Sequence, residues 1–189
     1  MTSKTVRSIF LDRDGILNVY LPGAYVRCPG EMALIPGVAS AIRLLNDRLI
    51  PVVVISNQQG VGKGVMSRDD LHAVQHAIED ALLSEAGATI DAWYYCTELA
   101  ASNSGRRKPE PGMLFEAAND LGLDLSATAF IGDSQSDIAA GRSASVGATV
   151  LVLSGATRQD QAAMIQPRPD YIFDTLRDAV AWVLKEDRK

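Results

Sequence analysis

Short apolar runs rich in β-branched residues alternate along the whole chain with stretches of helical periodicity, and this alternation limits the fold more than any other feature. Six runs are predicted to be strands: Ser8–Leu11, Val52–Ile55, Ala92–Cys96, Ala129–Ile131, Thr149–Leu153 and Tyr171–Phe173. Apolar strands separated by helices are typical of a parallel sheet that helices cover on both sides. The sequence therefore predicts an α/β fold, a Rossmann-like three-layer sandwich with a mainly parallel sheet.

Apolar spacing and capping residues predict helices between these strands. One amphipathic face is formed by Val38, Ala41, Leu45 and Leu49, a second by Leu71, Val74, Ile78 and Leu82, and a closing helix by Leu176, Val180, Val183 and Leu184. Ser67 followed by Asp70 is typical of a capping box, and Gly122 and Gly147 are expected helix ends. Since no repeat or long linker divides the chain, we expect residues 1–189 to form a single domain.

The composition and the two cysteines indicate a soluble cytoplasmic enzyme. The net charge of −5 and the lack of a basic run argue against nucleic-acid or membrane partners. Residues 1–8 lack the apolar core of a signal peptide, and no apolar segment approaches the roughly 18 residues of a membrane span. Cys28 and Cys96 are far apart, which favours two reduced thiols over a disulfide. We expect a monomer or weak dimer.

Polar side chains follow the predicted strands directly. Seven of them share this position: Asp12 and Asp14 after the first strand, Ser56 and Asn57 after the second, Lys108 in the loop after the third, and Asp133 and Asp137 after the fourth. In an open parallel sheet, ligands bind beyond the carboxyl ends of the strands, near the point where the strand order reverses. We therefore expect these side chains to converge on one edge of the sheet.

The first two motifs each have a structural and a chemical interpretation. Asp12 and Asp14 are two positions apart and can both face one pocket, but aspartate and glycine are also common in turns. Ser56 and Asn57 can donate hydrogen bonds to phosphate oxygens, although a role in ending the strand is favoured when this motif is taken alone. Neither motif decides the function by itself.

The later motifs add positive charge and further carboxylates. Lys108 can neutralise a phosphoryl group or a buried carboxylate, although lysines in loops are usually solvated. Asp133 offers Mg²⁺ a hard oxygen ligand, and it can also cap the following helix. The occurrence of all four motifs together, in this order and at strand ends, indicates a site for magnesium-dependent phosphoryl transfer.

Taken together, the motifs resemble those of the haloacid dehalogenase superfamily of phosphatases. The matching residues are Asp12-x-Asp14, Ser56, Lys108 and Gly132-Asp133-x-x-x-Asp137. The resemblance runs from Ile9 to about Leu153, nearly the whole chain. It implies that Asp12 is the nucleophile that forms an aspartyl-phosphate, that Asp14 is the acid and then the base, and that Ser56 and Lys108 hold the transferring oxygens.

The resemblance also implies a Mg²⁺ site. Its expected residues are Asp12, Asp14 through the main-chain carbonyl, Asp133 and Asp137. As an acid and base near neutral pH, Asp14 has to carry a proton part of the time. We therefore expect neighbouring carboxylates to raise its pKa above the ordinary value of about 3.9.

The spacing of the motifs leaves no room for a cap domain. The stretch 14–56 holds one loop and one helix, and 56–108 holds a helix, a strand and a loop. Within the superfamily, the residue patterns of 11–18, 56–60 and 107–113 look most like those of two groups. These are the D-glycero-D-manno-heptose 1,7-bisphosphate 7-phosphatases and the histidinol-phosphate phosphatases.

The heptose enzymes, which belong to carbohydrate metabolism, are preferred because the chain offers candidate groups for a second phosphate. These groups are Lys63, Arg106 and Arg107. Asn57 and Gln58 are also expected to bind substrate. Histidinol phosphate or another sugar phosphate is the alternative substrate.

One departure from both groups of relatives concerns zinc. They typically carry a zinc loop, built from Cys, His and further Cys, before the lysine motif. Here Cys96 fits the first ligand, but no His or second Cys follows before Lys108. Because one thiolate cannot complete a tetrahedral site, we expect no structural zinc.

A receiver-like domain, in which phosphorylated Asp12 signals instead of turning over, is the alternative of another class. Receivers also use a strand-end aspartate, magnesium and a lysine, but they have no need of an acid–base group such as Asp14. A phosphomutase is disfavoured, because such enzymes usually need a cap. His72 and His76 lie four residues apart on a predicted helix without an evident third ligand, which favours a solvated face over a metal site.

Overall fold

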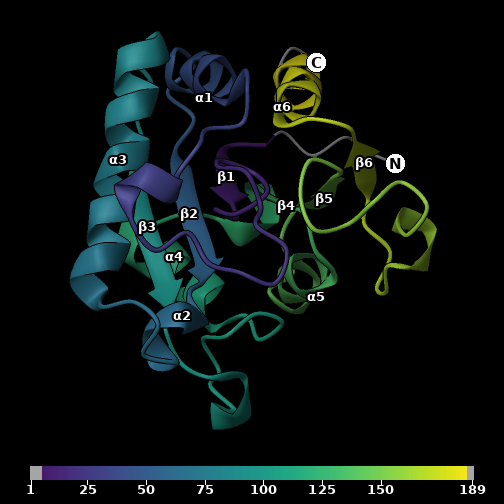
Figure 1. Ribbon diagram of the computed structural model, residues 1–189. Helices are drawn as coiled ribbons and strands as arrows, with labels where there is room; N and C mark the ends of the chain where they lie inside the picture. The colour runs from purple at the N-terminus through teal and green to yellow at the C-terminus, as the bar shows by residue number, and fades with distance from the viewer. Residues whose placement is uncertain (1–5, 187–189) are drawn as a thin grey trace.

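The computed structural model describes residues 6–186, and these contain a six-stranded sheet (Figure 1). Its strands are β1 (Ser8–Leu11), β2 (Val52–Asn57), β3 (Ala92–Cys96), β4 (Thr128–Gly132), β5 (Ala148–Val152) and β6 (Tyr171–Phe173). They lie in the order β3-β2-β1-β4-β5-β6, and every neighbouring pair is parallel. The predicted α/β class is confirmed, with a sheet that is parallel throughout the described residues.

Helices cover both faces of the sheet. They are α1 (Val38–Asn46), α2 (Gln59–Gly62), α3 (Arg68–Ala86), α4 (Gly112–Leu121), α5 (Gln135–Ser143) and α6 (Leu176–Glu186), with short 3₁₀ turns at Pro29–Glu31, Ala100–Ser102, Leu125–Ala127 and Ala162–Met164. Since successive strand residues point to opposite faces, Ile9 and Leu11 pack with α1, α3 and α6, whereas Phe10 packs with α4 and α5. Figure 1 shows the resulting three layers.

The strand boundaries agree with the sequence prediction to within two residues. The largest difference is in β2, which continues through Ser56 and Asn57 because these residues pair in register with Tyr95 and Cys96 of β3. The end of β2 is therefore held by the sheet ladder. This gives the polar residues of the second motif a fixed backbone.

The helix caps are mostly as predicted. Ser67 and Asp70 form the expected capping box at the start of α3, and Gly122 ends α4 with a φ of 63°. Two expectations were wrong. Leu49 is not on the buried face of α1, because the helix ends at Asn46 and Leu49 adopts a φ of 55° with 90% of its surface exposed. Gly147 does not end a helix, since α5 already ends at Ser143.

The order of the strands reverses at β1, so the topological switch point of the sheet lies between β1 and β4. The chain runs outward from β1 to β2 and β3 on one side and to β4, β5 and β6 on the other.

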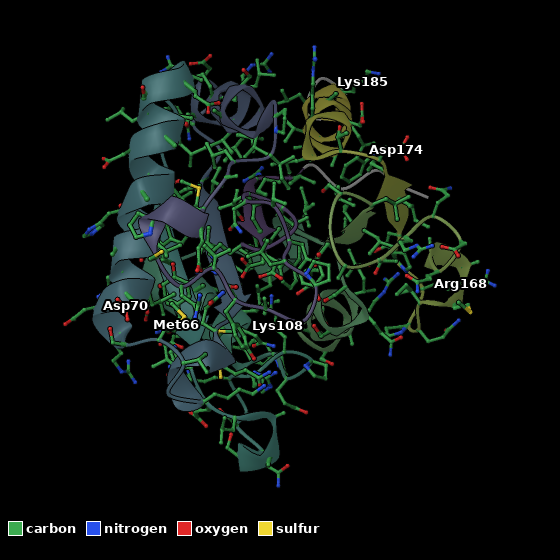
Figure 2. The ribbon with its side chains drawn as sticks, in the orientation of Figure 1. Met66, Asp70, Lys108, Arg168, Asp174 and Lys185 are labelled. Atoms are coloured by element: carbon green, nitrogen blue, oxygen red, sulfur yellow. The ribbon has the colours of Figure 1, made fainter. Side chains whose placement is uncertain are left out.

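The segment between β1 and α1 is a loop with one short 3₁₀ turn, so a cap domain is absent from residues 6–186. In the view of Figure 2, Lys108 lies between α2 and α5. Within the described part of the chain, no helix has the length and apolar character needed to cross a bilayer.

Candidate active site

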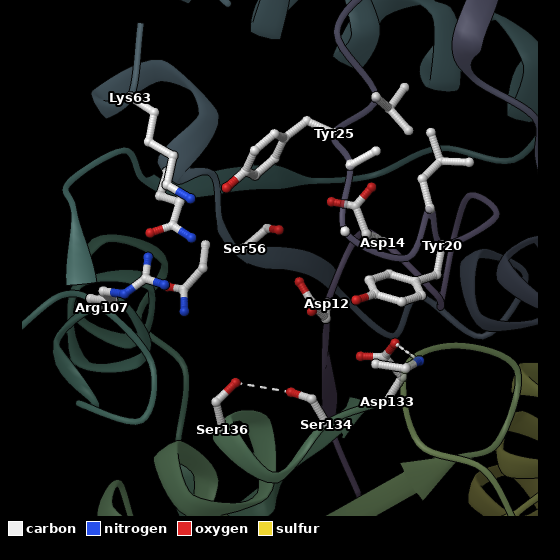
Figure 3. Close-up of a pocket in the computed structure, with 17 residues that line it drawn as sticks. Asp12, Asp14, Tyr20, Tyr25, Ser56, Lys63, Arg107, Asp133, Ser134 and Ser136 are labelled. Atoms are coloured by element: carbon white, nitrogen blue, oxygen red, sulfur yellow. Dashed lines mark hydrogen bonds between the residues drawn. The ribbon is translucent and has the colours of Figure 1, made fainter. Parts of the chain in front are cut away.

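A cavity of about 480 Å³ opens beyond the carboxyl ends of β1, β2 and β4 (Figure 3). Many of the residues singled out in the sequence line it, namely Asp12, Asp14, Ser56, Asn57, Lys63, Arg107 and Asp133. The expected convergence of the strand-end motifs is therefore observed. The other wall comes from the loop after β1, through Tyr20 and Tyr25, which sequence reasoning missed.

Lys108 lies beneath this cavity and connects two carboxylates. Its Nζ is 2.9 Å from Oδ1 of Asp12 and 2.6 Å from Oδ1 of Asp137, and it donates a hydrogen bond of 2.7 Å to the carbonyl of Ile55. Burial alone would lower the pKa of Lys108, but the two carboxylates outweigh burial and raise it. The ammonium is therefore held charged next to Asp12.

Asn57 fixes the backbone of Lys108. Its Nδ2 donates to the carbonyl oxygen of Lys108 at 2.9 Å, and its Oδ1 accepts from the Lys108 N–H at 3.1 Å. Both ends of the amide are thus engaged by the neighbouring loop. The geometry thus gives Asn57 a positioning contact, and because Asn57 also lines the cavity, its expected substrate contact stays a prediction.

Asp133 is held by a loop that the sequence analysis did not single out, residues 153–157 after β5. The N–H of Ala156 donates to Oδ2 of Asp133 at 2.6 Å, and Ser154 Oγ donates to the carbonyl of Gly15 at 2.6 Å. Any Cβ on Gly155 would overlap Oδ2 of Asp133. In the sequence, the available signal for this loop was Gly155, shortly after β5. Its contact, Asp133, lies more than twenty positions earlier in the chain.

Asp14 faces three donors. Arg13 Nη2 is 2.9 and 3.0 Å from its two oxygens, Asn18 Nδ2 donates at 2.8 Å and Gln58 Nε2 donates at 2.8 Å. Burial would raise the pKa of Asp14, but Arg13 and the two amides outweigh it and lower the pKa. The expectation of a raised pKa was therefore wrong for the ligand-free site, because Arg13, Asn18 and Gln58 together outweigh the effect of burial.

The predicted substrate-binding residues separate into two groups. Lys63 and Arg107 line the cavity from one side, with Lys63 Nζ 5.5 Å from the centre of the Tyr25 ring (Figure 3). Arg106 instead pairs with Glu116 at 2.9 Å, away from the cavity. Gln58 is only 1% exposed and does not line the cavity. Neither Arg106 nor Gln58 lines the cavity, so a substrate contact by either residue stays a prediction that this geometry does not favour.

Comparisons with known proteins agree with this geometry. Residues 105–179 match the family model described as "HAD-hyrolase-like". The D-glycero-D-manno-heptose-1,7-bisphosphate 7-phosphatase of Thermosynechococcus vestitus is 37% identical over 187 residues, covering 93% of this chain and 94% of that protein. The chain belongs to the phosphatases of the haloacid dehalogenase superfamily.

Other members of this superfamily match at similar length. The D-glycero-beta-D-manno-heptose-1,7-bisphosphate 7-phosphatase of Yersinia pestis is 31% identical, with 93% of this chain and 94% of that protein covered. The crystal structure of D,D-heptose 1,7-bisphosphate phosphatase from B. bronchiseptica, complexed with magnesium and phosphate, superposes with a TM-score of 0.86 at 28% identity. It covers 96% of this chain and 99% of that one. The predicted family and fold are confirmed.

The acidic residues of this superfamily member fit a divalent cation. Oxygens of Asp12, Asp133 and Asp137 lie within 4.8 Å of one another, the only such group among residues 6–186. Burial and neighbouring carboxylates raise the pKa of Asp12 to about 6, against the opposing effect of Lys108, and that of Asp133 to about 8. A bound cation would relieve this crowding, and carboxylate oxygens are the ligands that Mg²⁺ prefers.

The members of this acidic group are not equivalent. Asp137 pairs with Lys108 through one oxygen and caps α5 through the other, accepting from the Ser134 N–H at 3.0 Å. Asp12 and Asp133 are therefore the carboxylates that remain to face a metal ion. The carboxylate of Asp14 is outside the group, so a contribution from its main-chain carbonyl stays a prediction.

The cysteines and histidines lie apart from this centre. Cys96 is buried and Cys28 exposed, both with free thiols. His72 and His76 are on the exposed side of α3. The lack of structural zinc stays a prediction, to be tested by metal analysis.

Proposed function

We propose that this phosphatase is a Mg²⁺-dependent D-glycero-D-manno-heptose 1,7-bisphosphate 7-phosphatase. The observation that carries the proposal is the meeting of Asp12, Lys108 and Asp133 at one cavity, with two cationic side chains, Lys63 and Arg107, on its side. Support for the substrate comes from relatives of matching length that bear this name.

Asp12 is the proposed nucleophile. The Arg13 N–H, at 2.7 Å, and Lys108 Nζ both engage Oδ1, which leaves Oδ2 to attack phosphorus. As the new O–P bond forms, the bond from phosphorus to the sugar oxygen breaks, giving an aspartyl-phosphate. Mg²⁺ bound by Asp12 and Asp133 would offset the repulsion between the carboxylate and the phosphate dianion.

Asp14 is the proposed acid and base. It gives a proton to the leaving sugar oxygen and then accepts one from the water that hydrolyses the aspartyl-phosphate, which restores Asp12 and releases phosphate. The approach of a phosphate dianion favours the protonated form of Asp14, opposing the effect of Arg13. Ser56 Oγ is proposed to hold a transferring oxygen, and the positive charge of Lys108, whose three donors are engaged by Asp12, Asp137 and Ile55, is proposed to stabilise the transferring oxygens.

The distal phosphate is proposed to bind Lys63 and Arg107, at the side of the cavity away from Asp133. We also propose that residues 1–189 act as a single phosphatase domain, that the protein is a monomer or weak dimer, and that it works in the cytoplasm. The two free thiols are compatible with that compartment.

A substrate panel tests the assignment. The kcat/KM values for both anomers of the heptose bisphosphate, histidinol phosphate and several sugar monophosphates are compared with Mg²⁺ present. We expect the heptose bisphosphate to be hydrolysed most efficiently, and Asp12→Asn to abolish all turnover. Equal weak rates across the panel would overturn the substrate, whereas a single stoichiometric labelling of Asp12 without turnover would favour a receiver.

A further inference from the structure

We propose that Gln58 is a positioning residue that holds the carboxyl group of Asp14 in a fixed place relative to the phosphoryl group. This inference rests on the proposed function, because it assigns a role toward the acid–base group of that reaction. It concerns where the carboxyl group lies, and it replaces the substrate contact first expected for Gln58.

The amide nitrogen of Gln58 joins two residues of the site. Its Nε2 donates to Oδ2 of Asp14 at 2.8 Å and to Oγ of Ser56 at 3.1 Å. Both protons of the amino group are therefore used. Because a carboxylate only accepts hydrogen bonds, the amino end and not the carbonyl end of the side chain has to face Asp14.

The backbone of Gln58 is anchored, so its side chain reaches Asp14 from a fixed point. Its N–H donates to the carbonyl of Cys96, the last residue of β3, at 2.7 Å. The residue is 1% exposed, and its own Oε1 is buried without a hydrogen-bond partner. A buried carbonyl left without a partner is a cost to folding. This indicates that the contacts to Asp14 and Ser56 set the orientation of the amide.

The three donors to Asp14 are not equivalent. Arg13 and Asn18 belong to the same loop as Asp14, so they fix its side chain relative to its own backbone. Gln58 comes from the end of β2 and ties the carboxyl group to Ser56, the proposed ligand of the transferring oxygens. The distance between the acid and the leaving oxygen therefore depends on Gln58. A shift of about 1 Å in such a distance can change a rate by roughly 100-fold.

The leaving group distinguishes a positioning role from a general loss of structure. An alkyl phosphate needs Asp14 to protonate its leaving oxygen, whereas 2,4-dinitrophenyl phosphate has a leaving group that departs without a proton. The kcat/KM value reports only the steps up to that departure, so hydrolysis of the aspartyl-phosphate does not enter. In Gln58→Met we expect kcat/KM for the heptose bisphosphate to fall roughly 10- to 100-fold, with little change for the dinitrophenyl ester.

Gln75→Met is the matched control, since Gln75 also donates from Nε2 to a carboxylate, Glu79, at 3.0 Å, but lies on α3 outside the site. It is expected to change neither rate. If Gln58→Met does not fold, Gln58→Leu also removes the donor without adding a charge and should give the same selective loss. Equal losses for both esters, or none, would overturn the role of Gln58. A wild-type protein that hydrolyses neither ester would overturn the proposed function instead.

Discussion

Lys108 and Asp137 form an ion pair with 2.6 Å between Nζ and Oδ1, and each side chain is only 1% exposed. The pair connects the loop after β3 to the start of α5, while the same ammonium lies 2.9 Å from Asp12. In the interior, removal of one partner leaves the other as an uncompensated charge. Asp137 therefore contributes to the site by holding the lysine in place.

Replacement of this lysine, Lys108→Met, should impair both stability and turnover. We expect the unfolding free energy to fall by roughly 3–5 kcal/mol, because Asp137 and Asp12 lose their buried partner. The expected loss in kcat is at least about 100-fold, the usual cost of removing one charge-stabilising donor. Denaturant unfolding and steady-state kinetics measure the two effects.

Arg106→Met is the control for that change, because it removes a cation from the exposed pair with Glu116. An exposed ion pair contributes about 1 kcal/mol or less. Comparable destabilisation by the two variants would contradict the role of the buried pair.

The crowded carboxylates predict an unusual pH dependence for the metal-free protein. Folding raises the pKa of Asp12 to about 6 and that of Asp133 to about 8, mainly through burial. Between about pH 4 and 8 the folded state then binds more protons than the unfolded chain, so its stability falls as pH rises. Mg²⁺ binds the ionised carboxylates and should reverse this trend.

Melting temperatures measured across that range, with EDTA and with Mg²⁺, check the sign. Asp133→Asn should remove much of the slope seen in EDTA, since the group with the higher of the two pKa values no longer titrates. Identical slopes for this variant and the wild type would show that another group is responsible.

Gly155→Ala tests the loop that holds Asp133. The added Cβ would overlap Oδ2 of Asp133 and lie 2.7 Å from Cα of Gly15. We expect a loss of about 1–3 kcal/mol in stability together with weaker Mg²⁺ activation, measured by titrating the metal against activity. Gly30→Ala is the matched control, because a Cβ there meets nothing within 4 Å.

Lys63→Met and Arg107→Met test the proposed site for the second phosphate. Each should lower kcat/KM for the heptose bisphosphate roughly 10- to 100-fold, the range expected for a lost charge-assisted hydrogen bond. Hydrolysis of 4-nitrophenyl phosphate, which has one phosphate, should change far less. Arg106→Met should match the wild type with both substrates. A loss for the bisphosphate in that variant would mean that Arg106 belongs to the site for the second phosphate.

Elemental analysis tests the prediction about zinc. The purified protein is expected to contain far less than one zinc per chain, because Cys96 has no second cysteine or histidine in the following loop. Stoichiometric zinc that survives dialysis would contradict this expectation.

Much of the site could be predicted because it depends on strand ends. Asp12, Ser56 and Asp133 each follow an apolar run, and the carboxyl ends of parallel strands meet at one edge of the sheet. The side-chain types then limited the chemistry. The same argument predicted the layers of the fold, since β-strand and helical periodicities are both clear in the sequence.

The contacts that surround these residues could not be predicted in the same way. Arg13 is adjacent to Asp14, yet its lowering of the pKa of Asp14 depends on a buried side-chain conformation. Ala156 holds Asp133 through a backbone N–H, a group that every residue except proline possesses. The direction of Arg106 is likewise set by Glu116, ten positions away in α4. Sequence spacing carries no signal for such contacts.

The double contact of Asn57 with the backbone of Lys108 has a consequence for protein engineering. The backbone of the lysine is held from the end of β2, whereas residues 104–107 are tied to the turn around it, since the Arg107 N–H donates to Ser104 and the Gly112 N–H donates to Gly105. Residues 98–103, which make neither of these contacts, are therefore suited to insertions or exchanged sequences that alter which molecules are accepted, with the bond-breaking step left intact.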